Sequence, residues 1–414
     1  MKGNVLVGQS GGPTAVINAS LAGVYSAAKR LGADKVFGMR HGIQGLLQGD
    51  YVDMDDYVKN ETDLELLKRT PSAFLGSCRF KLPRIENDRE IFEKLFRQIE
   101  EMEISYFFYI GGNDSMDTID QLARFAAEKN SDIRFIGVPK TIDNDLVCTD
   151  HTPGFGSAAK FVAASTKELI RDNKVNDQKV VTVIEVMGRD AGWLTGSTAL
   201  CRGADCEGPD LIYLPEIPFD VDDFLHSIVE LQKTHRAVVA VVSEGIRSKD
   251  GQYVCEYSAS AKSIDAFGHK QLTGTARVLA DLVNEKTGSK VRAIEFSSLQ
   301  RCAAHLASLT DQTEAFMAGN AAVEAANQGL TGKFVTLLRK NDNPYICETG
   351  ICNVSEVANL KKDVPREWIN EEGNYVTKEF IDYVMPLIQG EVEPIMLDGL
   401  PRHIPHISQL SKQE

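Results

Sequence analysis

Short apolar runs alternate with helical patterns through most of this chain, and this alternation constrains the fold more than any other feature. The expected strands cover residues 4–8, 35–39, 106–110, 133–138, 179–187, 210–214, 236–244 and 290–296. Several are continuous β-branched runs, as parallel strands buried on both faces require. Helical patterns lie between them, for example at 115–128, 157–171 and 311–327. The pattern predicts a doubly wound α/β fold, in which ligands bind at the carboxyl ends of the strands.

Length and composition bound the number of domains and the compartment. With 414 residues and 43% hydrophobic content, the chain is long enough for two or three globular domains. No apolar run approaches the roughly 18 residues of a membrane helix, and the N-terminal sequence does not have the apolar segment of a signal peptide. Eight cysteines fit a reduced chain better than a disulfide scaffold. We therefore expect a cytoplasmic protein.

Two C-x4-C pairs, Cys201/Cys206 and Cys347/Cys352, raise the question of a structural zinc site. Their spacing is wider than most zinc knuckles use, and no histidine stands near either pair in the sequence. We interpret all four residues as ordinary thiols.

The charge of the chain limits its partners. A net charge of −14 and an isoelectric point near 5.2 argue against nucleic acids and against anionic membranes. An anionic substrate must therefore be bound by arginine and lysine residues that are concentrated locally.

The last part of the chain departs from the strand–helix pattern. Proline, glycine and asparagine interrupt it at 341–350, 370–374 and 398–406. One helix is expected over 378–390, closed by Gly390. We expect residues 346–414 to form a C-terminal extension packed on the body.

Two glycine turns follow apolar strands, in GQSGGPT (8–14) and IGGNDSMD (110–117). A strand, a glycine turn and a helix commonly bind phosphate through backbone amides. The first turn, with Gly11 and Gly12, is a weak signal alone, because it matches neither G-x-G-x-x-G nor a P-loop. The second turn carries Asn113 and Asp114, and an acidic side chain there would repel a phosphate.

A third motif, GVPKTIDNDLVCTDHTPGFGS, follows the expected strand 133–138. Asp143 and Asp145 stand two residues apart, so one can act as general base while the other binds a metal ion. Lys140 and Thr141 beside them suit a phosphate group. The alternative interpretation is a solvated turn rich in Asp and Asn.

Further charged residues follow other strands. Arg189 follows the strand in VIEVMGRD, Glu244 ends the strand in VSEG, and Arg292 and Arg301 flank the strand in VRAIEFSSLQR. Each alone is typical of a protein surface. Their joint placement at strand ends indicates a ligand site.

Together these motifs resemble those of the 6-phosphofructokinases. SGGPTAVIN, AFLGSCRF, GGNDS, PKTIDND, EVMGR, SEG and LQR occur in that family's order and approximate spacing, over about residues 3–330. The resemblance implies Mg²⁺-dependent phosphoryl transfer to the 1-hydroxyl of fructose 6-phosphate, in a cleft between two doubly wound α/β domains. It implies a donor-binding domain of residues 1–155 with about 300–345, and a sugar-phosphate-binding domain of residues 156–299.

The resemblance also implies a role for each matching residue. Asp143 resembles the general base that takes the proton of the sugar hydroxyl, and Arg79 resembles the arginine that stabilises the transferring phosphoryl group. Gly12 resembles the glycine under the donor phosphates. Contacts to the sugar phosphate are implied for Thr141, Ile142, Asp143, Met187, Gly188, Arg189, Glu244, Arg292 and Arg301. In the family, the residue that Arg292 resembles often comes from a neighbouring subunit.

Two positions indicate the phosphoryl donor. Family members that use ATP have motifs that resemble GGDGS and PGTIDND. This chain has Asp114 and Lys140 in place of two of the glycines in those motifs. Asp114 would occupy the space of a nucleotide's α-phosphate and oppose its charge, and Lys140 adds positive charge beside the transferring phosphates. Pyrophosphate has no α-phosphate, and repulsion of a few kcal/mol shifts donor preference about 100-fold or more.

These two residues resemble the pyrophosphate-dependent branch of the family, whose reaction should run in both directions. We count Asp114 and Lys140 with the catalytic residues, and Lys140 also with the donor-binding residues. One alternative is an ATP-dependent 6-phosphofructokinase. Another is a catalytically silent regulatory subunit, against which the intact residues Asp143, Asp145, Arg189 and Glu244 argue.

The chain also departs from the family pattern. Asn113 stands where many relatives have a magnesium-binding aspartate, so the implied Mg²⁺ site, Asn113 with Asp145, has less charge. Ser298 replaces a histidine, and Lys179 stands beside the position of an arginine that reaches a neighbouring subunit. These changes favour a homodimer without effector control over a regulated homotetramer.

Overall fold

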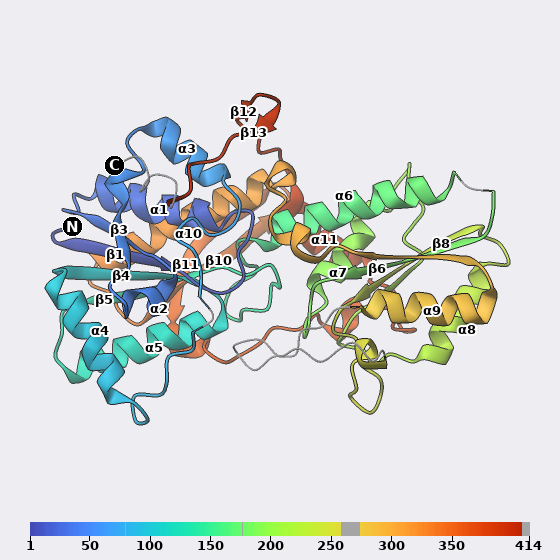
Figure 1. Cartoon of the computed structure of the whole chain (residues 1–414), viewed down its shortest axis with the longest axis horizontal. Helices are drawn as coiled ribbons and strands as arrows, with labels where there is room; N and C mark the ends of the chain where they lie inside the picture. Colours follow the sequence, from blue (N-terminus) through green and yellow to red (C-terminus); the bar gives the residue numbers. More distant parts are fainter. Residues whose placement is uncertain (79, 176, 258–273, 408–414) are drawn as a thin grey trace. The chain divides into compact units, whose positions relative to one another are not determined.

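The computed structural model describes residues 1–78, 80–175, 177–257 and 274–407 (Figure 1). The chain divides into two compact units. The first contains Met1–Ser157, Arg301–Lys361 and the residues from Gln389 onwards, and the second contains Ala158–Gln300 and Lys362–Ile388. Among the residues that the structure describes, none of the helices combines the length and the apolar character needed to cross a membrane.

The first unit is built on a seven-stranded sheet. Its strand order is β11 (Tyr345–Asn353), β10 (Lys333–Asp342), β5 (Arg134–Pro139), β4 (Ile104–Gly111), β1 (Asn4–Gln9), β2 (Val36–Met39) and β3 (Tyr51–Asp53). The five central strands are parallel. The two edge strands, β3 and β11, are antiparallel to their neighbours.

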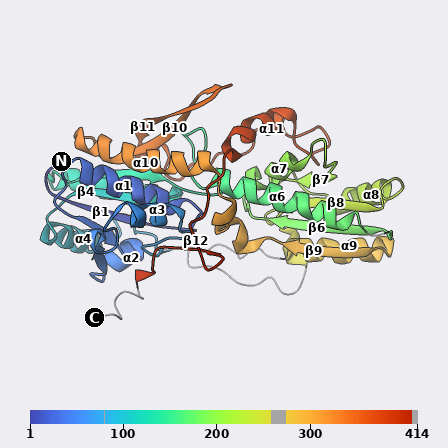
Figure 2. The ribbon, with the colours of Figure 1, turned by 90° about the horizontal axis from the view of Figure 1, so that it is seen from above.

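Helices cover both faces of this sheet (Figures 1 and 2). One face carries α1 (Ile17–Arg30), α3 (Glu61–Arg69) and α10 (Leu309–Asn327), and the other carries α2 (Gly42–Leu46), α4 (Arg89–Glu101) and α5 (Asn113–Glu128). Val5 and Val7 of β1 pack on the first face, whereas Leu6 packs on the second. Burial on both faces explains the continuous apolar runs in the sequence.

The second unit is built on a parallel sheet of four strands, in the order β7 (Leu211–Tyr213), β8 (Ala237–Ser243), β6 (Val180–Val186) and β9 (Lys290–Glu295). Its helices are α6 (Phe155–Asn173), α7 (Trp193–Ser197), α8 (Val221–Leu231), α9 (Thr275–Thr287) and α11 (Lys378–Val384). Helices α8 and α9 share an apolar core with the sheet, and α7 packs against α11.

Short elements complete the chain. The 3₁₀ helices are Met54–Asp56, Thr198–Cys201, Val254–Tyr257, Ser297–Arg301, Ala304–Leu306, Val354–Glu356, Arg366–Trp368 and Met385–Ile388. The strands β12 (Met396–Leu397) and β13 (Leu400–Pro401) form a small hairpin. The expected α/β fold with mostly parallel sheets is confirmed, and all eight expected strands occur.

The C-terminal region differs from the expectation. Residues 346–414 do not form one extension, because β11 is an edge strand of the first unit's sheet and Lys362–Ile388 belong to the second unit. The helix expected over 378–390 ends at Val384 and continues as a 3₁₀ turn. Pro386 accounts for this, since it has no amide hydrogen and its ring clashes with the preceding helical turn. The assignment of donor and sugar-phosphate binding to the two units stays a prediction.

Candidate active site

The turn after β1 lies against the side chain of Lys140. Gly11 has a φ of 76°, which favours glycine, and its amide donates to the carbonyl oxygen of Cys78 at 3.2 Å. Lys140 is only 3% exposed, and its Nζ donates to the carbonyl oxygen of Gly12 at 2.7 Å. A Cβ atom on Gly12 would lie 3.6 Å from Nη1 of Arg301. Three of the residues predicted from the sequence, Gly12, Lys140 and Arg301, are therefore close together, and two of them are cationic.

The turn after β4 leads directly into α5. The amide of Lys140 donates to the carbonyl oxygen of Gly111 at 3.1 Å, which fixes this turn to the end of β5. Asp114 lies in the first turn of α5, where the helix dipole stabilises a negative charge. Its carboxylate is 39% exposed and lies 3.3 Å from Nζ of Lys81. Lys81 was not predicted from the sequence, although it directly follows the CRF motif.

The loop between β5 and α6 is closed by its own hydrogen bonds. The amide of Asp143 donates to Oγ1 of Thr141 at 3.1 Å, and Oγ1 of Thr152 donates to the carbonyl oxygen of Thr141 at 2.8 Å. Gly154 has a φ of 110° and pairs with Thr141. A Cβ atom on Gly154 would lie 2.6 Å from the Cγ2 methyl group of Thr14, so this loop packs directly on the turn after β1. The backbone around Asp143 is thus fixed beside the glycine turn.

Asn113 and Asp145 follow neighbouring parallel strands, β4 and β5. The Nδ2 group of Asn113 donates to the carbonyl oxygen of Leu360, which fixes the orientation of the amide. Its Oδ1 atom is buried and has no hydrogen-bond partner among the described residues. A buried oxygen without a hydrogen-bond partner lowers the stability of the fold unless a ligand or a water molecule interacts with it. Both side chains offer oxygen atoms, the ligands that Mg²⁺ prefers, and Asp145 would supply the charge of such a site.

In the second unit, predicted residues gather at the carboxyl edge of the sheet. Met187, Gly188 and Arg189 follow β6, and Glu244 follows the adjacent strand β8. The amide of Gly188 donates to Oε1 of Glu244 at 3.4 Å. The amide of Met187 donates to Oε1 of Gln300 at 3.1 Å. The strand ends therefore place a carboxylate and a guanidinium group on one edge.

Arg292 does not lie at this edge. It is the third residue of β9 and pairs in register with Thr182, near the beginning of β6. Its Nη1 atom donates to Oδ2 of Asp172 at 2.8 Å and to Oδ1 of Asn173 at 3.0 Å, at the C-terminal end of α6. Within one chain, Arg292 is thus placed apart from Gly188.

Two other predicted residues need separate mention. Ile142 is 8% exposed, so a ligand could reach it mainly through its backbone. Arg79 lies outside the described residues.

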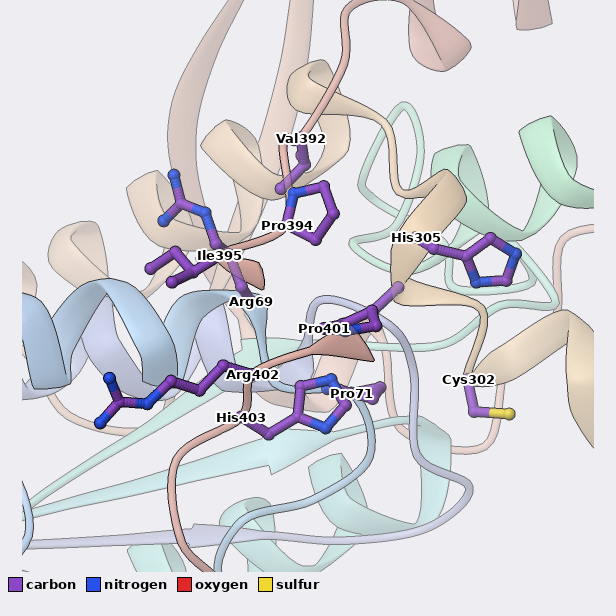
Figure 3. A pocket seen from close by; sticks show the side chains of 11 residues that line it. Arg69, Pro71, Cys302, His305, Val392, Pro394, Ile395, Pro401, Arg402 and His403 are labelled. Carbon is purple, nitrogen blue, oxygen red and sulfur yellow. The ribbon is translucent and has the colours of Figure 1, made fainter. Parts of the chain in front are cut away.

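Figure 3 shows a hollow on the first unit. Its lining residues are Arg69, Pro71, Cys302, Ala304, His305, Val392, Pro394, Ile395, Pro401, Arg402 and His403. None of the predicted site residues is among them. The Nε group of Arg69 donates to the carbonyl oxygen of Glu393, so this arginine anchors the C-terminal segment. We interpret the hollow as a by-product of that packing.

The comparisons with known proteins show the family of the chain. The family model described as Phosphofructokinase matches residues 4–326, so the chain belongs to this family. It is 39% identical over 407 residues to a pyrophosphate–fructose 6-phosphate 1-phosphotransferase of Methylococcus capsulatus, covering 97% of this chain and 95% of that protein. It is 40% identical over 403 residues to the protein of that name from Halomonas elongata, covering 96% of this chain and 95% of that protein.

A solved structure and a more distant relative complete the comparison. The crystal structure of a pyrophosphate-dependent phosphofructokinase from Nitrosospira multiformis matches with a TM-score of 0.87 at 38% identity, covering 97% of this chain and 95% of that one. An ATP-dependent 6-phosphofructokinase of Streptomyces coelicolor is 32% identical over 335 residues, covering 80% of this chain and 90% of that protein.

Proposed function

We propose that this protein acts in glycolysis by transferring a phosphoryl group from inorganic pyrophosphate to the 1-hydroxyl of fructose 6-phosphate, which forms fructose 1,6-bisphosphate and phosphate. The same reaction also runs in reverse. The relatives that match nearly the whole chain carry the name of this activity. The single observation that carries the choice of donor is the combination of Asp114 at the start of α5 and Lys140 under Gly12.

The donor preference follows from electrostatics. Two unit negative charges about 5 Å apart repel by about 3 kcal/mol at an effective dielectric constant near 20, and by less where solvent screens them. Asp114 is partly exposed and paired with Lys81, so we expect the lower part of this range. Even about 1.4 kcal/mol would disfavour a nucleotide's α-phosphate tenfold. Pyrophosphate avoids this repulsion and gains the charge of Lys140.

On the acceptor side, Asp143 takes the proton of the sugar hydroxyl as the new bond to phosphorus forms. Its position matters more than an unusual pKa, because phosphoryl transfer depends chiefly on alignment and charge neutralisation. We assign Arg189, Glu244 and Arg301 to the sugar phosphate, and Arg79 to the transferring group. Mg²⁺, when held by Asn113 and Asp145, would neutralise charge on the phosphates.

We further propose a homodimer that works in the cytoplasm. The position of Arg292, away from Gly188 of its own chain, supports a role in the neighbouring subunit's site. All eight cysteines are free thiols, in line with a reducing compartment.

A coupled assay with fructose 6-phosphate, Mg²⁺ and either pyrophosphate or ATP tests the proposal. We expect product with pyrophosphate and little with ATP. Equal rates with ATP would overturn the choice of donor but not the reaction. Turnover with neither donor would overturn the function and favour a regulatory subunit.

A further inference from the structure

The first two turns of α10 present two buried carboxylates to the loop that carries Asp143. Asp311 is 1% exposed and Glu314 is 4% exposed, and they are three residues apart on one helix, so both point the same way. The segment they contact, residues 149–157, completes the loop that begins with Thr141 and leads into α6. The function proposed above gives neither residue a role.

Asp311 binds the backbone at the start of α6. Its Oδ1 accepts from the amide of Gly154 at 2.8 Å, and its Oδ2 accepts from the amide of Ser157 at 2.9 Å. Amides at a helix start have no partner within the helix, and the helix dipole favours a negative charge there. Gly154 is the residue that pairs with Thr141 across the loop. The carboxylate therefore holds both the helix start and the closure of the loop.

Glu314 holds the same loop through a histidine. Its Oε2 lies 2.6 Å from Nε2 of His151, whose Nδ1 lies 2.7 Å from Oδ1 of Asp150. Nε of Arg339 donates to the same Asp150 oxygen at 3.1 Å. The hydroxyl of Tyr345 donates to Oε1 of Glu314 at 2.7 Å. Alternating charges thus connect α10, the loop and the β10–β11 hairpin.

Capping a helix with a buried carboxylate costs more free energy than capping it with a neutral side chain. Burial raises the pKa of Asp311 to about 6, although Ser157 and the two amides favour the charged form. A serine or threonine can satisfy amides at a helix start without a buried charge. The stronger, charge-assisted hydrogen bonds are useful where a backbone must be held in one geometry.

Helix α10 packs against α1, the helix that follows the turn after β1. A Cβ atom on Gly319 would lie 2.2 Å from the carbonyl oxygen of Ser20, so α10 and α1 are in direct backbone contact. Helix α1 begins directly after the turn that contains Gly12. Helix α10 therefore supports both the turn that contains Gly12, through α1, and the loop that carries Asp143.

We propose that Asp311 and Glu314 are positioning residues, which hold the Thr141–Ser157 loop so that Asp143 stays aligned with the phosphates at Gly12. The proposal rests on the proposed function, since the group being aligned is the general base of that reaction. Neither residue contacts the substrate in this proposal, so their removal should affect turnover rather than binding.

Kinetics of Asp311→Asn and Glu314→Gln test the proposal, with Glu324→Gln as the matched control, because Glu324 is an exposed carboxylate on the same helix. We expect kcat per folded enzyme to fall about 10- to 100-fold in each variant, while KM for pyrophosphate and for fructose 6-phosphate changes less than about threefold. The control should match the wild type. A kcat equal to that of the wild type in both variants would overturn the proposal.

Hydrogen exchange separates this proposal from the proposed function. In Asp311→Asn, amides of residues 149–157 should exchange at least about tenfold faster, while those of β1 and β4 keep their rates. If the wild type transferred no phosphoryl group, the proposed function would fail, yet faster exchange would still show that Asp311 holds the loop. Unchanged exchange in this segment would overturn the positioning role. Should Asp311→Asn not fold, Glu314→Gln gives the same comparison through His151.

Discussion

The ammonium group of Lys140 donates a hydrogen bond to the carbonyl oxygen of Gly12 at 2.7 Å, while the amide of the same residue is bonded to Gly111. One buried cation thus joins the two glycine turns that follow β1 and β4. Asp114 begins the helix after the second turn, with Lys81 beside it. In the proposed function, this cation and this carboxylate together select the phosphoryl donor.

Replacing both Asp114 and Lys140 with glycine should change the preferred phosphoryl donor. In Asp114→Gly with Lys140→Gly, we expect activity with pyrophosphate to fall at least about 100-fold and the ratio of ATP to pyrophosphate activity to rise by a similar factor, because repulsion and compensation are both removed. Initial rates with each donor measure this ratio. Glu128→Gln, which changes an exposed carboxylate at the C-terminal end of the same helix, should leave it unchanged. An unaltered ratio in the double variant would show that other residues select the donor.

Asp143→Ser should lose turnover while keeping substrate binding. The general base contributes typically about 10²- to 10⁴-fold, so kcat should fall by that factor. The dissociation constant for fructose 6-phosphate, measured by calorimetry, should stay within about threefold of the wild-type value. Asp132→Ser, at a fully exposed position, serves as the control. Near-normal turnover would remove Asp143 from the base role.

The fold was predictable because the strands are buried on both faces. Continuous apolar runs then mark most of the central strands, as Val5, Leu6 and Val7 illustrate by packing on opposite sides of one sheet, although β10 was not among the predicted strands. Carboxyl ends of parallel strands meet at one edge, so motifs such as TIDND and MGR could be placed there from sequence alone.

Contacts that depend on distant segments could not be predicted. Asn113 is fixed by the carbonyl group of Leu360, 247 residues further along the chain, and no local pattern encodes such a pair. Lys81 meets Asp114 because of the path of an irregular segment. No local pattern marks Asp311 either, since only the tertiary structure brings Gly154 to it.

Replacing Asn113 with aspartate should strengthen metal binding at a cost in stability. A carboxylate adds charge to the oxygen that has no partner in the structure, so the dissociation constant for Mn²⁺, measured by calorimetry, should fall several-fold. The carbonyl oxygen of Leu360 loses its donor, which should cost about 1 kcal/mol. Asn284→Asp also removes an amide-to-carbonyl bond, in the second unit, and should leave metal affinity unchanged. Unaltered affinity in Asn113→Asp would place the metal elsewhere.

The ion pair of His151 should make stability depend on pH. Burial lowers the pKa of His151, but Glu314 and Asp150 outweigh this effect and raise it to about 8. Because the unfolded value is near 6.5, the stabilisation is fully present below that pH and is lost as the pH rises through about 8, a change of about 2 kcal/mol. His151→Gln should therefore be less stable than the wild type at pH 6, with the difference shrinking by pH 9. Thermal unfolding at both values measures this. His226→Asn, at an exposed helical position, is the control, and a difference that stays constant with pH would contradict the ion pair.

Both tryptophans of the chain lie in one aromatic cluster of the second unit, so their fluorescence should report the unfolding of that unit. Trp193 stacks on Phe380 at 5.9 Å between ring centroids and meets Trp368 edge-on at 6.0 Å. Phe380 is fully buried, so Phe380→Ala should destabilise this unit by about 3–5 kcal/mol and move the fluorescence transition to lower urea concentration.

The matched control for Phe380→Ala is Phe92→Ala, because Phe92 is equally buried but belongs to the core of the first unit. Each unit has its own apolar core, and such units can unfold separately. Phe92→Ala should therefore leave the tryptophan transition in place while lowering the transition seen by far-ultraviolet circular dichroism. If both variants moved the tryptophan transition equally, the two units would unfold as one cooperative body, and the separate unfolding expected from their cores would be wrong.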